Sequence, residues 1–87
     1  MKLKLKGSEA AAGTSSTNAS NVGLATLVRV HNGGGTRRLV SLETSAAALI
    51  GTFTIAPNAT ELLDKTSTDE IFAAHTDVKL VGVAYYS

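Results

Sequence analysis

Short segments of alternating apolar and polar residues, separated by turn residues, limit the folds that this chain can adopt. Alternation at period two is typical of β-strands, because successive side chains point to opposite faces. The segments with this pattern are residues 22–31, 36–43, 49–56, 60–65 and 78–86. Several short strands at this spacing predict a sandwich or a barrel. We therefore expect an all-β domain, a small antiparallel β-sandwich of jelly-roll-like type.

A glycine-rich run, residues 32–35 (Asn-Gly-Gly-Gly), separates the first two segments. Asn-Gly and Gly-Gly supply the positive φ angles of tight turns, so the run predicts a hairpin. A phosphate-binding loop would need Gly-Lys-Ser/Thr leading into a helix, whereas a strand-like Thr-Arg-Arg-Leu-Val follows here. Farther along, residues 67–70 (Ser-Thr-Asp-Glu) match a capping box, and they predict either one helical turn or a strand after them.

The first 21 residues differ from the rest of the chain. Residues 1–6 alternate lysine with Leu3 and Leu5, which predicts either an extended strand with both leucines on one face or a frayed, solvated terminus. Residues 7–21 are Ser, Thr, Ala, Gly and Asn with a single charge, so they have little apolar surface to offset their ordering entropy. We expect an extended, flexible N-terminal arm over residues 1–21 and a β-sandwich domain over residues 22–87.

The chain is small for a self-sufficient domain. Its 87 residues include no Trp and no Cys, so the core must come from aliphatic side chains and disulfides are excluded. A domain of this size buries only roughly 60% of the surface of its unfolded chain. Small domains are commonly completed by disulfides, metals or other subunits. We expect a homo-oligomer, or many copies docked on a larger protein body.

The sequence contains no arrangement of side chains that is typical of catalysis. His31 and His75 lie far apart, and neither has the spacing of a metal ligand. Most serines lie in the polar N-terminal segment, and no Gly-x-Ser-x-Gly elbow is present. Asp69 and Glu70 are adjacent in the chain and therefore point to different faces. We expect no enzyme activity, no cofactor and no metal site.

Exposed apolar and basic side chains are the candidate binding residues. A net charge of +1 does not favour nucleic acid or an anionic membrane, and no stretch approaches the roughly 20 apolar residues of a membrane span. The arginines near the glycine-rich run form a modest basic cluster that suits a salt-bridged protein contact. The predicted partner-binding residues are Leu3, Leu5, Arg29, Arg37, Arg38, Tyr85 and Tyr86.

Five short motifs follow one another between residues 27 and 86. They are Leu27-Val-Arg-Val-His-Asn32, Ile50-Gly-Thr-Phe-Thr-Ile55, Leu62-Leu-Asp-Lys65, Thr68-Asp-Glu-Ile71 and Val81-Gly-Val-Ala-Tyr85. In their order and spacing they resemble small virion structural proteins of tailed bacteriophages, including cyanophages, of the capsid decoration or cement-like kind. Residues 1–21 depart from that pattern, because the polar lead-in of such proteins is shorter.

The resemblance implies a non-enzymatic structural protein that binds the capsid lattice through protein–protein contacts. The implied partner is the major capsid protein or another virion protein, with no nucleic acid and no membrane. No signal-peptide apolar run follows residues 1–6, so we expect synthesis in the host cytoplasm and a final location in the virion. The alternative is a neck, tail or adhesion-type β-sandwich that binds another virion protein or a surface glycan through Tyr85 and Tyr86. A small host-directed inhibitor is a further alternative. Such inhibitors are more often strongly acidic, and this chain is not.

Overall fold

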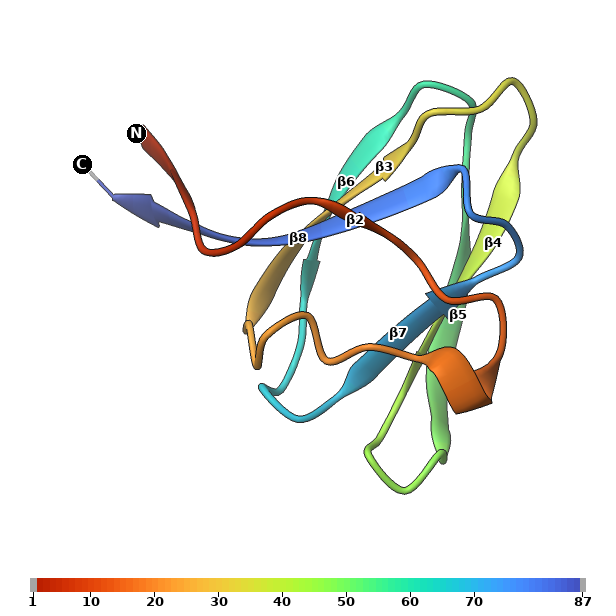
Figure 1. Cartoon of the computed structure of the whole chain (residues 1–87), viewed down its shortest axis with the longest axis horizontal. Coiled ribbons are helices and arrows are strands. Elements are labelled where there is room, and N and C mark those ends of the chain that lie inside the picture. The colour runs from red at the N-terminus through yellow and green to blue at the C-terminus, as the bar shows by residue number, and fades with distance from the viewer. Residues whose placement is uncertain (1, 87) are drawn as a thin grey trace.

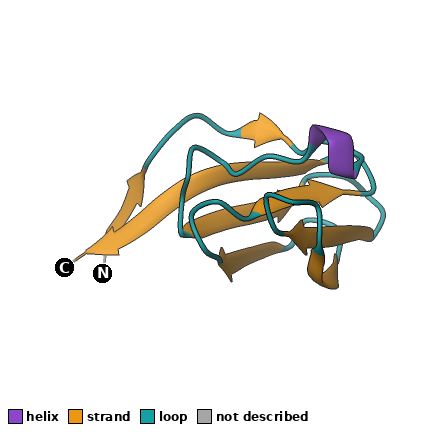
Figure 2. Ribbon diagram, turned by 90° about the horizontal axis from the view of Figure 1, so that it is seen from below, coloured by secondary structure: helices purple, strands orange, loops and turns teal. Residues whose placement is uncertain are grey.

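The computed structural model describes residues 2–86, which form two antiparallel β-sheets packed face to face (Figures 1 and 2). The molecule is flat, with extents of 35, 32 and 19 Å. Residues 2–86 contain no α-helix, and one 3-10 turn, η1 (Ser16–Asn18), precedes the main strands. The expected all-β class and antiparallel two-sheet architecture are confirmed.

The larger sheet contains the first and the last strand of the chain. Its order is β1-β8-β3-β6, and β2 lies beside the first part of β8. These strands are β1 (Lys2–Leu5), β2 (Ala10–Ala11), β3 (Leu27–Asn32), β6 (Thr60–Asp64) and β8 (Val78–Tyr86). The smaller sheet has the order β5-β4-β7, with β4 (Arg38–Glu43), β5 (Leu49–Ile55) and β7 (Glu70–Ala73). This strand order does not confirm a jelly-roll-like arrangement.

Three connections at one end of the sandwich carry the chain from one sheet to the other. β3 leads into β4, β5 into β6 and β7 into β8, and each time the two strands belong to different sheets. The hairpin expected at residues 32–35 is therefore wrong. The run does bend the chain, but β3 pairs with β6 on one edge and β8 on the other, which leaves no edge for β4.

The buried side chain of Asn32 joins two of these corners. Its amide donates to the backbone oxygens of Thr36 at 2.7 Å and Ile55 at 3.2 Å. Its side-chain oxygen accepts the NH of Gly34 at 3.0 Å, and its backbone oxygen accepts the NH of Asn58 at 2.8 Å. Because buried polar groups need partners, this position requires a side chain that both donates and accepts.

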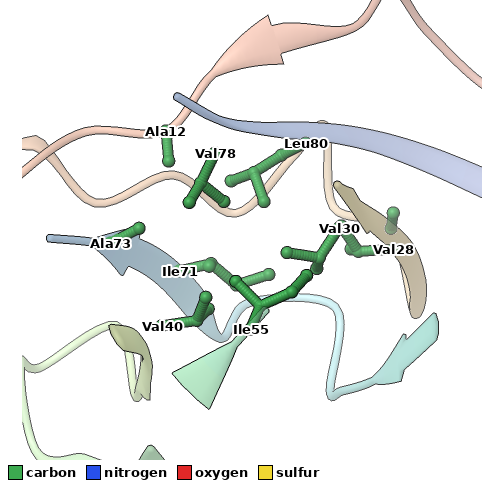
Figure 3. Close-up of a cluster of buried hydrophobic side chains, with 10 residues drawn as sticks. Ala12, Val28, Val30, Val40, Ile55, Ile71, Ala73, Val78 and Leu80 are labelled. Atoms are coloured by element: carbon green, nitrogen blue, oxygen red, sulfur yellow. The ribbon is translucent and has the colours of Figure 1, made fainter. Parts of the chain in front are cut away.

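Aliphatic side chains from alternate strand positions form the core between the sheets (Figure 3). In β3, Val28 and Val30 are fully buried, whereas the residues that alternate with them are partly exposed. β8 contributes Val78 and Leu80 in the same way. The other members come from both sheets and from the N-terminal segment: Ala12, Ala25, Val40, Ile55, Ile71 and Ala73. The period-two pattern therefore selects the side chains that are buried.

Residues 10–20 lie along one side of the sandwich and close it. β2 pairs with β8, the NH of Ala73 donates to the oxygen of Gly13 at 2.9 Å, and Ser20 forms a bridge with Ile71. Ala12 is 2% exposed and belongs to the core. The structure thus does not set residues 1–21 apart as an arm. Backbone hydrogen bonds to the edges of β8 and β7, the core side chain of Ala12 and the hydroxyl of Ser16, which donates to the buried carboxylate of Glu43 at 2.8 Å, hold this segment in place.

The strand expected over residues 22–31 begins only at Leu27. Val22, Gly23 and Leu24 have φ angles of 55°, 65° and 62°, which belong to a left-handed turn and not to a strand. This turn passes over β8 at Gly82, where an added Cβ would lie 2.9 Å from the Cβ of Ala25. The close approach explains why glycine occupies that position.

The segment after residues 67–70 is strand β7, the second of the two outcomes that the sequence left open. The capping box expected over residues 67–70 does not open a helix, since Glu70 begins β7. Within these residues, the carboxylate of Asp69 accepts the backbone NH of Thr66 at 3.2 Å. Ile71 then pairs with Leu42 of β4 and packs in the core. Pairing with β4 provides the backbone partners that a single helical turn would lack.

Candidate protein-interaction surface

The face of the larger sheet that points away from the core carries a set of apolar side chains. In β8, Leu80 packs in the core, so alternation places Val83 and Tyr85 on the outer face. The register of β1 against β8 sets Leu3 opposite Tyr85 and Leu5 opposite Val83. We define the apolar face as the outward residues Leu3, Leu5, Leu27, Leu62, Val83 and Tyr85.

β3 and β6 extend this face across the sheet. Arg29 lies opposite Val81 of β8 and opposite Leu62 of β6, so all three point outward. Leu27 precedes the buried Val28 and therefore points outward as well. The apolar face thus includes side chains from four strands that lie far apart in the sequence.

Four members of the apolar face are large and exposed. The exposed fraction is 43% for Leu3, 64% for Leu5, 46% for Leu62 and 41% for Tyr85. Val83 lies among them and is only 2% exposed, so its neighbours cover it. Single exposed apolar side chains are common on protein surfaces, whereas a group of them on one face marks an interaction site.

Part of the apolar face lies on a two-stranded ribbon that projects from the body (Figures 1 and 2). Among the described strands, β1 alone pairs with the last part of β8, residues 83–86. Of the two outcomes left open for residues 1–6, the structure shows the strand, over Lys2–Leu5. Lys2 and Lys4 alternate with the leucines and lie on the other face of the ribbon. One face of the ribbon is therefore apolar and the other basic.

Arg29 lies at the border of the apolar face and is already paired. Its Nη1 is 3.2 Å from Oε2 of Glu9, and the two side chains are 32% and 45% exposed. Arg29 lies opposite Val81, which is 4% exposed, and Glu9 immediately precedes β2 on the other side of β8. An exposed ion pair contributes less than about 1 kcal/mol. The aliphatic stem of Arg29, which lies opposite Val81, can also shield Val81 from solvent.

The other predicted arginines lie in a different part of the molecule. Arg38 begins β4 in the smaller sheet, and its Nη2 is 3.3 Å from Oδ2 of Asp77 at the β7–β8 corner. Its Nε is buried and has no hydrogen-bond partner among the described residues. Arg37 precedes it and is exposed. Since Arg29 belongs to the larger sheet, the three arginines are not on one sheet face.

The structure brings together three of the seven predicted residues, Leu3, Leu5 and Tyr85, with Arg29 at their border. Tyr86 pairs with Lys2 in the backbone register, and its side chain lies outside the part that the structure describes. Leu62 is the residue that sequence reasoning missed. It is adjacent to Leu63 in β6, so one of the two had to point away from the core, and Leu63 is the one that packs against it.

Two hollows lie beside the strands of the larger sheet. A groove of about 310 Å³ runs between the edges of β5 and β6 and is lined by Phe53, Glu61, Leu62 and Leu63. A second hollow, of about 290 Å³, lies between the β1–β2 segment and residues 20–23 and is lined mostly by small residues. The first combines an apolar floor with a carboxylate, which suits the side chain of a lysine or arginine.

The amine of Lys65 closes the turn between β6 and β7. Lys65 is 7% exposed, and its amine donates to the backbone oxygens of Thr66 at 3.2 Å and Ser67 at 3.1 Å. Burial lowers the pKa of Lys65, and the nearby carboxylate of Asp69 offsets part of that effect. The contacts give this lysine a role in holding the turn.

The two histidines contact different residues. Nδ1 of His31 is 2.8 Å from Oγ1 of Thr60, and Nδ1 of His75 is 3.2 Å from Oδ2 of Asp77. Across residues 2–86, no three His, Asp or Glu side chains gather in a way that could hold a metal ion. No helix formed by these residues is long and apolar enough to cross a membrane.

The most distinctive surface is therefore the apolar face, with its projecting ribbon and with the β5–β6 groove at the opposite edge of the sheet. Its residues can bind an apolar protein surface, and the lysines and carboxylates at the two edges can add charge complementarity. Comparisons of this chain with family models, curated proteins and solved structures found no match.

Proposed function

We propose that this chain is a non-enzymatic structural protein of a phage particle, and that many copies bind the capsid lattice as a decoration or cement protein. Its partner is the major capsid protein or another virion protein, and the contacts are protein to protein, without nucleic acid, membrane or cofactor. The protein is made in the host cytoplasm and becomes part of the virion. The motif resemblance between residues 27 and 86 and the apolar face both support this proposal.

The single observation that carries the proposal is the presentation of Leu3, Leu5 and Tyr85 on one face of the ribbon. Complete burial of a large apolar side chain contributes about 1.5–3 kcal/mol, so the exposed parts of these three could contribute roughly 1 kcal/mol each at a contact. The β1–β8 pairing fixes their positions before binding, which lowers the entropic cost of association.

A lattice of identical subunits suits such a modest contact. One copy that binds through a few side chains would dissociate easily. When neighbouring copies also touch, each dissociation must break several contacts, and the layer is retained far longer than a single molecule. The proposal therefore requires many bound copies per particle.

Mass spectrometry of purified particles is the direct test. We expect the chain to be present in a fixed, high ratio to the major capsid protein. Its absence from purified particles would overturn the proposal.

A pelleting experiment then tests the surface. Particles that lack the chain are mixed with purified protein and sedimented, and the bound fraction is measured. Leu5→Asp should lower binding about tenfold or more, because it places a charge in an apolar contact. Leu49→Asp is the matched control, since Leu49 is also 64% exposed but lies in the smaller sheet. Equal loss in both variants would contradict the assignment of the apolar face.

The exposed ring of Tyr85 favours a second candidate, a neck, tail or adhesion-type module that binds another virion protein or a surface glycan. Fractionation of particles separates the two candidates. A decoration protein should remain with tailless shells, whereas a tail or adhesion module should remain with isolated tails. Glycan binding would appear as retention on a sugar array that Tyr85→Ala abolishes.

A further inference from the structure

The two outer edges of the larger sheet carry opposite charges. Among the described strands, β1 pairs with β8 alone and β6 with β3 alone, so each leaves one backbone edge unpaired. Lys2 and Lys4 lie on β1 and Lys6 follows it, whereas Glu61 and Asp64 lie on β6. All five side chains are exposed, and within residues 2–86 none of them forms an ion pair.

We propose that β1 of one copy pairs with β6 of the next copy, so that the larger sheet continues from molecule to molecule. A lysine-bearing edge strand normally resists pairing with other strands. An acidic edge strand removes that resistance, because opposite charges across strands attract. The inference rests on the proposed function in one respect, since it names the contact between copies that lie side by side on a lattice.

The strand directions allow this contact without turning the second copy over. Each neighbouring pair in the order β1-β8-β3-β6 is antiparallel, so β1 and β6 of one molecule run in opposite directions. A second copy placed beside the first in the same orientation therefore presents β6 antiparallel to β1. The outer faces of both sheets then point the same way, and the step can repeat with further copies.

One register between β1 and β6 of the next copy matches apolar residues on one face of the sheet and opposite charges on the other. With Leu3 opposite Leu62 of the next copy, the apolar faces of the two molecules become continuous. The same register sets Lys4 opposite Glu61 and Leu5 opposite Thr60. Outward residues thus meet outward residues, and the lysine meets the carboxylate on the other side of the sheet, as the period-two alternation requires.

The groove between β5 and β6 adds a place for the lysine side chain. It is lined by Phe53, Glu61, Leu62 and Leu63, and Glu61 and Leu63 alternate with the outward residues of β6. In the proposed register, Lys4 of the neighbour enters from this side. Its alkyl stem would cover Phe53 and Leu63, and its ammonium group would reach the carboxylate of Glu61.

The other edge pairings are less complementary. Two copies of β1 would bring their lysines together, and two copies of β6 would join two acidic strands, which like-charge repulsion opposes. β5 is an uncharged edge strand of the smaller sheet, and nothing in its residues selects a partner strand. The β1–β6 contact is the pairing in which the charges favour the partner.

Disulfide trapping tests the register directly, because the chain has no cysteine of its own. Purified Leu3→Cys protein is mixed with purified Leu62→Cys protein under mild oxidation, and the products are identified on non-reducing gels and by mass spectrometry. The control mixes Leu3→Cys with Leu39→Cys. Leu39 is 45% exposed, close to the 46% of Leu62, but lies on the smaller sheet.

We expect the Leu3–Leu62 heterodimer to form several times faster than the Leu3–Leu39 heterodimer, because directly opposite residues on paired strands have a Cα separation within the range of disulfides. Similar rates for the two mixtures would overturn the proposal. A product dominated by Leu3–Leu3 dimers would also overturn it.

Charge reversal tests the chemistry of the same contact. Lys4→Glu in the Leu3→Cys protein should slow the cross-link about fivefold to tenfold, since an attractive pair becomes repulsive. Adding Glu61→Lys to the Leu62→Cys partner should restore the rate. Reversal without effect, or without rescue, would contradict the pairing. These experiments use the purified chain alone, so their failure would leave particle binding, measured by pelleting, as a separate result.

Discussion

Individual residues fix the points where this chain changes direction. Asn32 uses its buried side chain to join the corner after β3 to the end of β5, through two donated hydrogen bonds and one accepted one. Asn58 takes a φ of 59° in the neighbouring corner, a left-handed conformation that asparagine tolerates better than most residues. The two corners are held together at the Asn32 backbone, so the sandwich depends on a few polar groups at one end.

The loop between β4 and β5 provides a matched pair of alanines. Ala47 has a φ of 64°, whereas the neighbouring Ala46 does not have a positive φ, and both are exposed. A left-handed conformation costs an L-residue about 1–2 kcal/mol, and the extra entropy of an unfolded glycine costs about 0.4–1 kcal/mol. Ala47→Gly should therefore raise the free energy of unfolding by about 0.5 kcal/mol, and Ala46→Gly should lower it by a similar amount. Urea denaturation measures both, and a loss of stability in both variants would contradict the turn geometry.

The lowered pKa of Lys65 predicts a dependence of stability on pH. Because burial lowers its pKa in the folded protein below 10.5, the unfolded chain binds more protons in the window between the two values. Stability contributed by this group should therefore rise with pH through that window and level off above 10.5. The measurement is the free energy of unfolding of the native protein minus that of Lys65→Met, from neutral to alkaline pH. A difference that stays flat or falls as pH rises would contradict the lowered pKa.

At the scale of elements, the alternation within each strand decides which side chains are structural and which are free to bind. In β6, Leu63 packs against the core while its neighbour Leu62 is 46% exposed. Leu63→Ala should lower the free energy of unfolding by about 1–2 kcal/mol, since it removes a partly buried side chain that packs against the core. Leu62→Ala should change it by less than about 0.5 kcal/mol. Equal losses in urea denaturation would show that β6 does not have the register described.

The elements that the sequence predicted best are those that local alternation alone defines. The pattern predicted the bounds of β5, β6 and β8 to within a residue or two. It also predicted that Leu3 and Leu5 share one face, without any knowledge of which strand pairs with β1. Pairing was not predictable in the same way. Residues 32–35 have hairpin chemistry, but whether such a turn returns the chain to the same sheet depends on distant strands that compete for the edges of β3.

The same distinction applies to the candidate surface. Apolar and basic side chains near the chain ends and the glycine-rich run were visible in the sequence. Two contacts follow only from the long-range arrangement of the strands: Tyr85 lies opposite Leu3, and Arg38 binds Asp77 in the turn between β7 and β8. The adjacent Leu62 and Leu63 indicate from the sequence alone that one of them points away from the core. That Leu62 belongs to the apolar face follows only from the pairing of β6 with β3.

The whole molecule has two unlike sides. Residues 10–20 close the side formed by β8 and β7, and a polar segment can do so because backbone hydrogen bonds to strand edges do not require large side chains. On the other side, β5 and β6 each have one outer edge without a strand partner within residues 2–86, and a groove separates these two edges. Residues 10–20 complete one side of this small domain, so the other side remains open for contact with a neighbouring molecule.

Two truncations separate the structural part of the N-terminal segment from the binding part. Removal of residues 1–6 deletes β1, whose own side chains are exposed but which covers Val83 from the opposite strand, so the free energy of unfolding should fall by about 1 kcal/mol. Removal of residues 1–20 also takes away Ala12 and uncovers Val78 and Ile71, which are fully buried, and should cost roughly 3 kcal/mol or more. Urea denaturation followed by circular dichroism distinguishes the two. If the longer deletion were as stable as the shorter one, residues 10–20 would not be part of the fold, and the closed side of the sandwich would be as open as the other.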